Sequence, residues 1–289
     1  MSESNFQNFN HLKIHTQYSI CEGAARIDDL QEYSKKNKIK SLGLWDTSNL
    51  CGALEFAEKL SKSGTQPIIG TQINFKFKDI IGLLPLIATS EKGYQNIIEF
   101  SSNSYLKNND KDEPHCNFND VLSTVNDIII LSGTINGLIG KLFIKGRIEE
   151  IEEIYSNLKK KFKNNFYIEI QRHGDENEKT FEQFNLNLSK KLDIPIIATN
   201  EVFYISKDMH DAHDALICIG NKTYLNEKNR VKYSNNHYLK SDNEMEKIFS
   251  DLPEALENNY NLIYKCNFKP SFSKPVLPNI SSDKGGNAD

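Results

Sequence analysis

Short apolar runs that end in polar residues recur along the chain. In the first run, Leu12 and Ile14 alternate with Lys13 and His15, and this period of two is typical of a β-strand. The same layout recurs in Leu42–Trp45 before Asp46, Pro67–Gly70 before Thr71 and Gln72, Phe166–Ile170 before Arg172 and His173, and Pro195–Ala198 before Thr199, Asn200 and Glu201. We therefore expect strands that carry polar side chains at their carboxyl ends.

Segments with the apolar spacing of amphipathic helices lie between these runs. They are Ile27–Lys36, Leu50–Ser61, Glu91–Tyr105, Ile148–Phe162 and Glu176–Leu192. Strands that alternate with helices predict an α/β fold with parallel strands and crossover helices. In such folds the carboxyl ends of the strands converge on one face, so we expect the polar clusters to meet there.

Eight stretches, in a fixed order from about His11 to about Cys266, carry a family resemblance. They are HLKIHTQYSICEGAARI, GLWDTSNLCGALEFAEKL, QPIIGTQI, LIATSEKGYQNII, IIILSGTINGLIGKL, FYIEIQRHG, IPIIATNEVFYISKDMHDAHDAL and KSDNEMEKIFSDLPEALENN. In these stretches the chain resembles the PHP (polymerase and histidinol phosphatase) domain, in the form found at the amino terminus of the bacterial DNA polymerase III alpha subunit. The resemblance implies a distorted (β/α)7 barrel.

The resemblance also implies a division of the chain. We expect a flexible amino terminus over residues 1–10 and a PHP domain over 11–268. Residues 269–289, rich in Pro, Ser and Gly, are expected to be a linker toward a palm domain that this chain does not contain. The polymerase site of the family, with its Mg²⁺-binding carboxylates, belongs to that palm domain.

In metal-active members of the family, the pattern is a His-x-His pair, an acid before a Gly, an Asp-His pair, a Glu, further His residues and a late Asp-x-His. The resemblance implies that His15, Glu22, Asp46, His173 and Glu201 are the remaining ligand positions here. At the other positions the chain carries Lys13, Thr47, Gln72, Leu83 and Phe203.

These replacements remove the chemistry of a multimetal site. Hydrolysis of a phosphoester by two or three divalent ions requires several N or O ligands for each ion. A protonated Lys13 cannot coordinate a cation, and the side chains of Leu83 and Phe203 offer no ligand atom. We therefore expect no cofactor, or at most one weakly held Zn²⁺ or Mn²⁺ at this vestigial site, and no confident catalytic residue.

Each surviving residue also has a structural interpretation. His15 and His173 fit half-buried histidines with satisfied ring nitrogens, Asp46 fits a cap of the helix that follows it, and Glu22 fits a turn. Glu201 could pair with Lys13, which would replace the lost cation by a buried positive charge. His210, His213 and Asp214 have ligand-like spacing, but residues three apart meet on any helix surface.

Composition limits the remaining function classes. The net charge is −4, with 35 basic and 39 acidic residues, so no global field draws the chain to nucleic acid. Five cysteines without a C-x-x-C pair indicate reduced thiols, and no apolar run or leader-like segment indicates a membrane. We expect a cytoplasmic protein.

Two functions of different classes remain. The first is a non-catalytic scaffold in DNA replication, which braces the palm of the alpha subunit and docks the proofreading exonuclease subunit. It would contact DNA only indirectly. The second is a residual metal-dependent phosphoesterase or 3'-5' exonuclease. We favour the scaffold, within a DNA-directed DNA polymerase (a nucleotidyltransferase) whose active site lies outside this chain.

Overall fold

A single curled β-sheet forms the centre of the molecule. The structure is a computed structural model that describes residues 9–108, 113–124 and 127–273. The strands are β1 (His11–Ile14), β2 (Ser41–Leu44), β3 (Gln66–Phe77), β4 (Ile80–Ala88), β5 (Cys116–Asn117), β6 (Ile128–Leu131), β7 (Phe166–Ile170), β8 (Ile196–Ala198) and β9 (Glu201–Val202). They follow the order β8-β7-β6-β4-β3-β2-β1-β9, and β5 pairs with β3 outside this path.

The two edge strands of this sheet are consecutive parts of one segment. β8 pairs with β7 and β9 pairs with β1, and only Thr199 and Asn200 lie between them. The backbone N–H of Thr199 still donates to the carbonyl of Ile170, at 3.1 Å. If β8 and β9 are counted together, seven members complete the ring, which confirms the predicted seven-stranded, distorted barrel.

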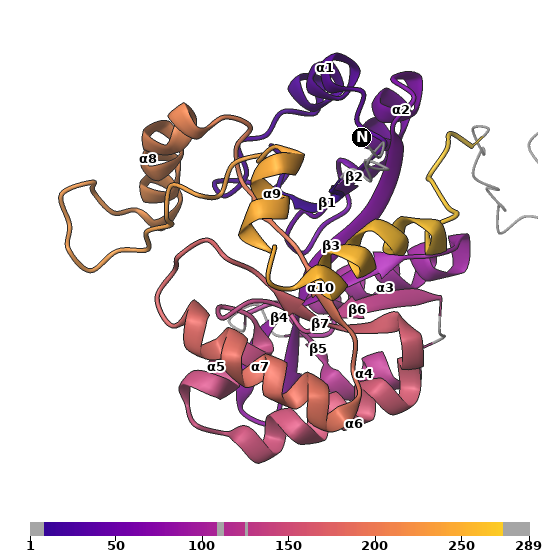
Figure 1. Cartoon of the computed structure of the whole chain (residues 1–289), viewed down its shortest axis with the longest axis vertical. Coiled ribbons are helices and arrows are strands. Elements are labelled where there is room, and N and C mark those ends of the chain that lie inside the picture. The colour runs from indigo at the N-terminus through magenta and orange to yellow at the C-terminus, as the bar shows by residue number, and fades with distance from the viewer. Residues whose placement is uncertain (1–8, 109–112, 125–126, 274–289) are drawn as a thin grey trace, which may run out of the picture.

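Helices surround the sheet (Figure 1). They are α1 (Ile27–Asn37), α2 (Ala53–Lys62), α3 (Glu91–Leu106), α4 (Phe118–Ser123), α5 (Leu138–Ile144), α6 (Ile148–Phe162), α7 (Glu178–Leu192), α8 (His210–Asn221), α9 (Asp242–Ile248) and α10 (Pro253–Leu262). The five helices expected from apolar spacing are all present, because their apolar faces cover the sheet; α2 and α7 begin a few residues later than expected. None of the described helices is long and apolar enough to cross a membrane.

One expected strand differs from the structure. The run Pro67–Gly70 does not end before Thr71, because β3 continues to Phe77 and forms an antiparallel pair with β4. Ile73 and Phe75 are buried on one face of this hairpin, and that burial stabilises the longer strand. Gln72 therefore lies within a strand, opposite Pro85, rather than in a loop. β4 is also antiparallel to β6, so the sheet is mixed.

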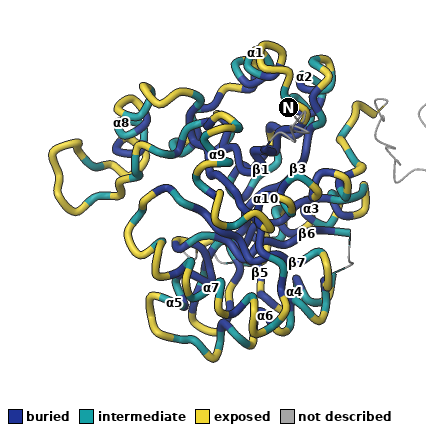
Figure 2. The backbone as a smooth tube through the Cα atoms, viewed as in Figure 1, coloured by how far each residue is buried: buried dark blue, intermediate teal, exposed yellow. Residues whose placement is uncertain are grey.

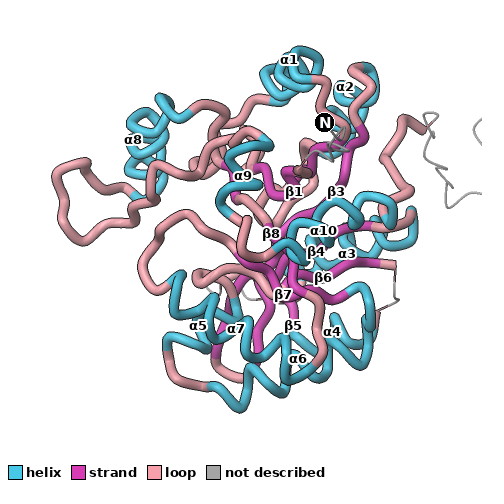
Figure 3. The backbone as a smooth tube through the Cα atoms, in the orientation of Figure 1, coloured by secondary structure: helices cyan, strands magenta, loops and turns pink. Residues whose placement is uncertain are grey.

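One end of the barrel interior is apolar, and the other end is polar. Alternate residues of successive strands, among them Ile129, Tyr167 and Ile197, point inward and pack with Trp45 and with Leu262 of α10. Figure 2 shows this buried centre in dark blue, and Figure 3 shows that it coincides with the strands. On β7 the next inward position after Tyr167 is Glu169, where the interior becomes polar.

A bulge in β1 places a lysine in this interior. His11 lies opposite Leu42 and Ile14 lies opposite Leu44, so three steps on β1 match two on β2. The backbone of Leu12 comes so close to Gly43 that a Cβ there would lie 2.1 Å from the Leu12 carbonyl oxygen. As a result Leu12 packs inside the barrel and the neighbouring Lys13 also faces the interior.

The division of the chain can be followed only in part. The first strand begins at His11 and the last described helical turn ends at Lys265. Most of the predicted amino-terminal segment 1–10 and of the predicted linker 269–289 lies outside the described residues. α8 and the loop that follows it project from the body (Figure 1).

Asn259 of α10 holds the closing segment of the barrel to β1. Its Oδ1 accepts from the Asn10 backbone N–H at 2.8 Å, and its Nδ2 donates to the carbonyls of Asn10 and Ala198 at 2.9 and 3.0 Å. The side chain is fully buried. These bonds join the residue before β1 to the end of β8 at the seam of the barrel.

We predict that Asn259→Ala lowers the free energy of unfolding by about 3 kcal/mol, because three buried groups lose their partner at about 1 kcal/mol each. The neighbouring Asn258, which makes one bond to the Ile196 carbonyl, is the matched control, and Asn258→Ala should cost about a third as much. Urea unfolding curves measure both values. Equal losses for the two variants would show that Asn259 does not hold the seam.

Candidate functional site

A buried ammonium group occupies the centre of the polar half of the barrel. Nζ of Lys13 lies 3.3 Å from Oε1 of Glu169 and 3.4 Å from Oε1 of Glu201. The side chains of Lys13 and Glu169 have no exposed surface. The predicted pairing of Lys13 with Glu201 is therefore present in the structure. Glu169 is a second partner that the sequence reasoning missed, although a Glu in the buried strand sequence FYIEI is the signal that could have found it.

Mutual attraction keeps these charges in the interior. Burial lowers the pKa of the Lys13 amine, but the carboxylates of Glu169 and Glu201 more than offset this, so the pKa lies above its ordinary value. For Glu201, burial raises the pKa, yet Lys13 and then His15 outweigh it and hold the pKa well below the usual range. Lys13 and Glu201 are thus both ionised at neutral pH.

Hydrogen bonds from neighbouring strands position Glu169. Its Oε1 accepts from Nε2 of Gln171 at 3.0 Å and from the hydroxyl of Thr199. Its backbone N–H donates to Oγ of Ser132 at 2.9 Å. Among the described residues, no donor lies within hydrogen-bonding distance of the second carboxylate oxygen, Oε2.

His15 joins the same charge network. Its Nε2 lies 3.0 Å from Oε1 of Glu201, and its Nδ1 lies 4.0 Å from Oε1 of Glu22. Burial lowers the pKa of His15, but the carboxylates of Glu22 and Glu201 more than compensate and hold the pKa above its ordinary value. Three of the five predicted ligand positions, at His15, Glu22 and Glu201, therefore lie together.

Phe203 fills the space beside His15. The two rings stack with centroids 4.6 Å apart, and Phe203 also contacts His213, Tyr233 and His237 at centroid distances of 5.3, 4.7 and 5.2 Å. The ring of Phe203 is buried. An apolar ring thus lies in the position that the family resemblance gives to a late histidine ligand.

The carboxylate of Asp46 is fully used by its neighbours. Oδ1 accepts from the Thr16 backbone N–H at 2.7 Å and from Oγ of Ser19 at 2.7 Å, and Oδ2 accepts from Oγ1 of Thr16 at 2.8 Å. The suggestion that Asp46 caps the following helix is wrong, because α2 begins at Ala53 and its Ncap residue is Gly52. Asp46 instead fixes the loop after β1 against the end of β2.

The remaining replaced positions also satisfy one another. Nε2 of Gln72 donates to Oγ1 of Thr47 at 3.0 Å. Leu83 of β4 lines a cavity of about 50 Å³ together with Glu22, Gln72, Glu201 and Phe203, among other residues. This cavity lies at the site where the predicted ligands were expected to meet.

The residues present do not fit a centre of two or three metal ions. Lys13 places a positive charge beside the Glu201 oxygen that would bind a cation, and Asp46 has its oxygens engaged by Thr16 and Ser19. Leu83 and Phe203 supply apolar surface. Ions that lie about 3.5 to 4 Å apart need a dense set of N and O ligands, and these groups do not provide it.

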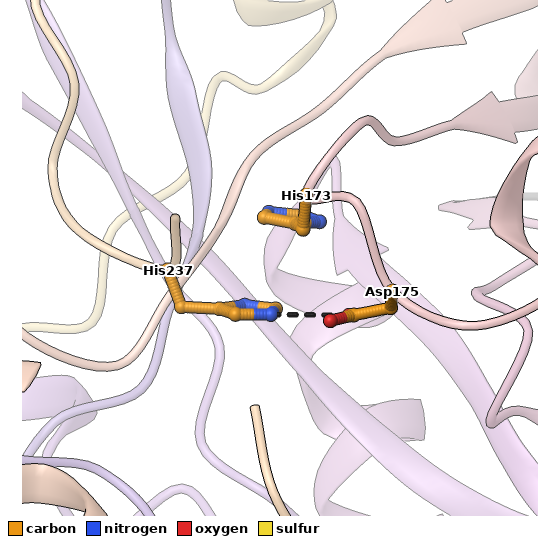
Figure 4. Close-up of side chains that lie close together, drawn as sticks. All are labelled: His173, Asp175 and His237. Atoms are coloured by element: carbon orange, nitrogen blue, oxygen red, sulfur yellow. Dashed lines mark hydrogen bonds and ion pairs between the residues drawn. The ribbon is translucent and has the colours of Figure 1, made fainter. Parts of the chain in front are cut away.

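His173 lies in a second cluster, with Asp175 and His237 (Figure 4). The rings of His173 and His237 stack at a centroid distance of 4.0 Å and an interplanar angle of 5°. Nε2 of His237 lies 3.2 Å from Oδ2 of Asp175. Burial, and then His237 and Lys240, hold the pKa of His173 well below its ordinary value, so its ring is neutral at neutral pH. The sequence reasoning missed Asp175 and His237, which follow no strand pattern.

The two clusters are joined through Glu201. Its backbone N–H donates to Nε2 of His173 at 3.2 Å, and its carbonyl accepts from Nδ1 of His237 at 3.1 Å. Its side chain points to Lys13 and His15. The short strand β9 therefore presents one residue to both clusters.

The helical set His210, His213 and Asp214 does not converge on a common point. Nε2 of His213 contacts the carbonyl of Glu22 at 2.8 Å, whereas Asp214 forms an ion pair with Arg230 at 2.5 Å. Nε2 of His210 lies 3.3 Å from the carbonyl of Tyr233. His213 thus joins α8 to the body, whereas His210 and Asp214 join α8 to the loop that follows it.

A family model for the PHP domain matches residues 11–173, more than half of the chain. The chain belongs to the PHP domain family. The matched region includes Lys13, His15, Glu169 and His173. Glu201 and His237 lie beyond its end.

Curated relatives that carry the name DNA polymerase III subunit alpha extend the similarity beyond the PHP match. The protein from Caulobacter vibrioides is 33% identical over 99% of this chain and 26% of its own length. The proteins from Rickettsia conorii and Borreliella burgdorferi are 37% and 35% identical over 95% and 93% of this chain, and over 23% and 25% of their own lengths. The chain thus spans about a quarter of the length of the curated relatives it matches.

Among solved structures, a metal-dependent phosphoesterase from Bifidobacterium adolescentis is similar to this chain. It aligns with a TM-score of 0.43 and 11% identity, over 66% of this chain and 86% of its own. A likeness at this level supports no functional argument.

The stability of the fold should depend on the buried ion pairs that Lys13 forms with Glu169 and Glu201. We expect Lys13→Met, which keeps the volume of the side chain, to lower the free energy of unfolding by about 3–5 kcal/mol at pH 7, because Glu169 and Glu201 then lie buried beside each other without a cation. Lys78, which is half exposed and also pairs with two glutamates, is the control, and Lys78→Met should have little effect.

The pH dependence follows from the two pKa shifts. The lowered pKa of Glu201 means that its contribution to stability is present above the ordinary value of 4.5 and is lost as the pH falls through the folded value. The raised pKa of Lys13 means that its contribution is present below 10.5 and is lost as the pH rises through the folded value. The loss of unfolding free energy caused by Lys13→Met should therefore be largest between pH 4.5 and pH 10.5, and it should become smaller in acid. A deficit that does not change with pH would contradict the electrostatic explanation.

Proposed function

We propose that the chain is the PHP part of a DNA polymerase III alpha-type subunit and serves DNA replication in the cytoplasm as a non-catalytic scaffold. In this role it braces the palm of the subunit and docks the proofreading exonuclease subunit, and it reaches DNA only through these partners. The similarity to alpha subunits over nearly the whole chain supports the replication context.

The observation that carries the scaffold proposal is the position of Lys13. Its ammonium lies between Glu169 and Glu201 at the place where the PHP resemblance implies a metal ligand. A fold that replaces a bound cation by an internal one keeps its shape without the metal, because the positive charge still neutralises the carboxylates. Phe203, stacked on His15, supports the same interpretation.

The competing function, a residual phosphoesterase or 3'-5' exonuclease, would use His15, Glu22, Asp46, His173 and Glu201 around one or two Zn²⁺ or Mn²⁺ ions. Those five residues do not form one set of ligands. His173 contacts Glu178 and Asn200, Asp46 is engaged by Thr16 and Ser19, and Glu201 is paired with Lys13.

We predict that the purified chain hydrolyses neither a phosphomonoester nor a single-stranded oligonucleotide above background when Mn²⁺ or Zn²⁺ is added. The reason is that Lys13 pairs with Glu201 and that Thr16 and Ser19 engage Asp46, so these carboxylates are not free to bind an added cation. The measurement is release of phosphate or nucleotide, with His15→Ala as the control variant. Metal-dependent hydrolysis that disappears in His15→Ala would overturn the scaffold proposal.

An exposed apolar surface supports the docking part of the proposal. We define the α8 surface by Ile20, Ile219, Tyr224, Leu225 and Val231, which are 84, 70, 74, 55 and 50% exposed. Figure 2 shows the projecting loop after α8 mainly in the colour of exposed residues. Apolar side chains this exposed are typical of interaction sites.

The parts of the α8 surface lie next to each other. A Cβ on Gly220 would come 2.6 Å from Cβ of Cys21, so the turn that carries Ile20 is in contact with the end of α8 that carries Ile219. The loop also carries the exposed cations Lys222, Lys228 and Lys232. Exposed apolar groups flanked by positive charge suit a partner segment that combines apolar and acidic side chains.

We predict that the exonuclease subunit binds this chain with measurable heat and that Ile219→Asp weakens the binding at least tenfold, because it adds a charge to the centre of an apolar contact. Ile144 of α5 is 60% exposed but lies outside the α8 surface, and Ile144→Asp is the control that should bind normally. Isothermal titration calorimetry measures the binding of the exonuclease subunit to the unmodified chain and to each of the two variants.

Two results would count against this docking proposal. No heat of binding at high micromolar concentration would exclude docking altogether. Equal weakening by Ile144→Asp and Ile219→Asp would exclude the α8 surface as the contact, while leaving the docking itself intact.

A further inference from the structure

We propose that His173, Asp175 and His237 form a binding site for one divalent transition-metal ion, with Zn²⁺ as the best match, which fastens the end of the loop after α8 to the barrel. This site shares only His173 with the set of ligands implied by the family resemblance, because Asp175 and His237 belong to no part of that set. The inference is independent of the scaffold proposal.

The first support is the geometry of the donor atoms. One ligand atom of each of the three residues lies within 4.8 Å of the others. Ligands of a single Zn²⁺, each at about 2.0–2.2 Å from the ion, lie roughly 3.5 Å apart. The pair of His237 Nε2 and Asp175 Oδ2, at 3.2 Å, already meets this spacing. To serve as the third ligand, Nε2 of His173 would leave its bond from the Glu201 N–H and its ring would leave the stack on His237.

The second support is the pair of acceptor groups that the two ring nitrogens of His237 face. Its Nδ1 faces the carbonyl oxygen of Glu201 at 3.1 Å and its Nε2 faces the carboxylate of Asp175 at 3.2 Å. Both partners are acceptors, so Nδ1 can donate to the carbonyl while Nε2 faces the carboxylate. A metal ion between Nε2 and Asp175 would be bound by both groups.

The outer contacts of both rings match those of metal-binding histidines. Such histidines donate their second N–H to a carbonyl or carboxylate, which orients the ring. His237 has the Glu201 carbonyl for this purpose. For His173, Nε2 accepts from the Glu201 backbone N–H at 3.2 Å, and Nδ1 faces the acceptor Oε1 of Glu178 at 3.3 Å.

The surrounding charge favours a divalent ion. The carboxylates of Asp175 and Glu178 contact the two histidine rings directly, at 3.2 and 3.3 Å. A cavity of about 20 Å³, large enough for one ion or water, is lined by Asp175, His237 and Glu169, among others.

Glu169 adds an independent sign that this cavity suits a cation. Its side chain is completely buried, and among the described residues its Oε2 has no hydrogen-bond donor. A buried carboxylate oxygen without a partner costs free energy, and a cation in the adjoining cavity would lower that cost through its charge.

The site would join segments that are far apart in sequence. His237 lies 62 residues from Asp175, at the end of the loop that follows α8. Hydrogen bonds already hold this segment in place, because Oγ of Ser234 and Nδ2 of Asn236 both donate to the His173 carbonyl at 2.8 Å. The ion would therefore bind to a largely formed site and stabilise the base of the α8 surface.

The test is binding of Zn²⁺, and of Co²⁺ as a coloured substitute, to the chain after removal of metal with a chelator. We expect one equivalent of Zn²⁺, a rise in melting temperature, and visible absorption by bound Co²⁺ that disappears when Zn²⁺ is added. Asp175→Asn keeps the shape of the side chain and should weaken binding at least 100-fold, as should His237→Ala. The control is His210→Ala, a nearby histidine outside the cluster, which should bind normally.

Three results would overturn the proposal. The unmodified chain could bind no Zn²⁺ at micromolar concentration. Asp175→Asn and His237→Ala could both retain full affinity. His15→Ala could weaken binding as much as His237→Ala, which would place the ion at the ligand set of the PHP family. Because Asp175→Asn is nearly isosteric, its result holds even if His237→Ala fails to fold.

Discussion

The polar half of this barrel depends on one buried ammonium group. Lys13 lies between Glu169 of β7 and Glu201 of β9, so its charge joins three strands that come from distant parts of the chain. Without a cation, two carboxylates would lie unneutralised in an interior from which water is excluded. The other arrangements of the site, including the stack of Phe203 on His15 and the bonds from Thr16 and Ser19 to Asp46, surround this charge.

Much of the fold could be predicted from the sequence, because its signals are local. The apolar spacing of Ile148–Phe162 matches α6 at both ends, and the alternation in Phe166–Ile170 matches β7. The continuation of β3 to Phe77 was not predicted. The hairpin that stabilises it is a pairing with β4, and strand pairing depends on partners that a single segment does not reveal.

The candidate site could be predicted only where it follows strand ends. Lys13, His15 and Glu201 come directly from strands, and their meeting agrees with the rule that carboxyl ends converge. Asp175 and His237 lie in loops, and their contact closes 62 residues of chain, so no spacing in the sequence indicates it. Glu169 differs, because it lies within the strand sequence FYIEI rather than at a strand end, and its partner Lys13 belongs to a distant strand.

The central claim is that Lys13 and Glu201 form a strongly coupled pair that replaces a bound cation, and a double-mutant cycle tests it most directly. The cycle compares the unfolding free energies of the chain, Lys13→Met, Glu201→Gln and the double variant. The account predicts a coupling energy of at least about 2 kcal/mol at pH 7, with the double variant more stable than the sum of the single changes implies. A coupling energy near zero would contradict it.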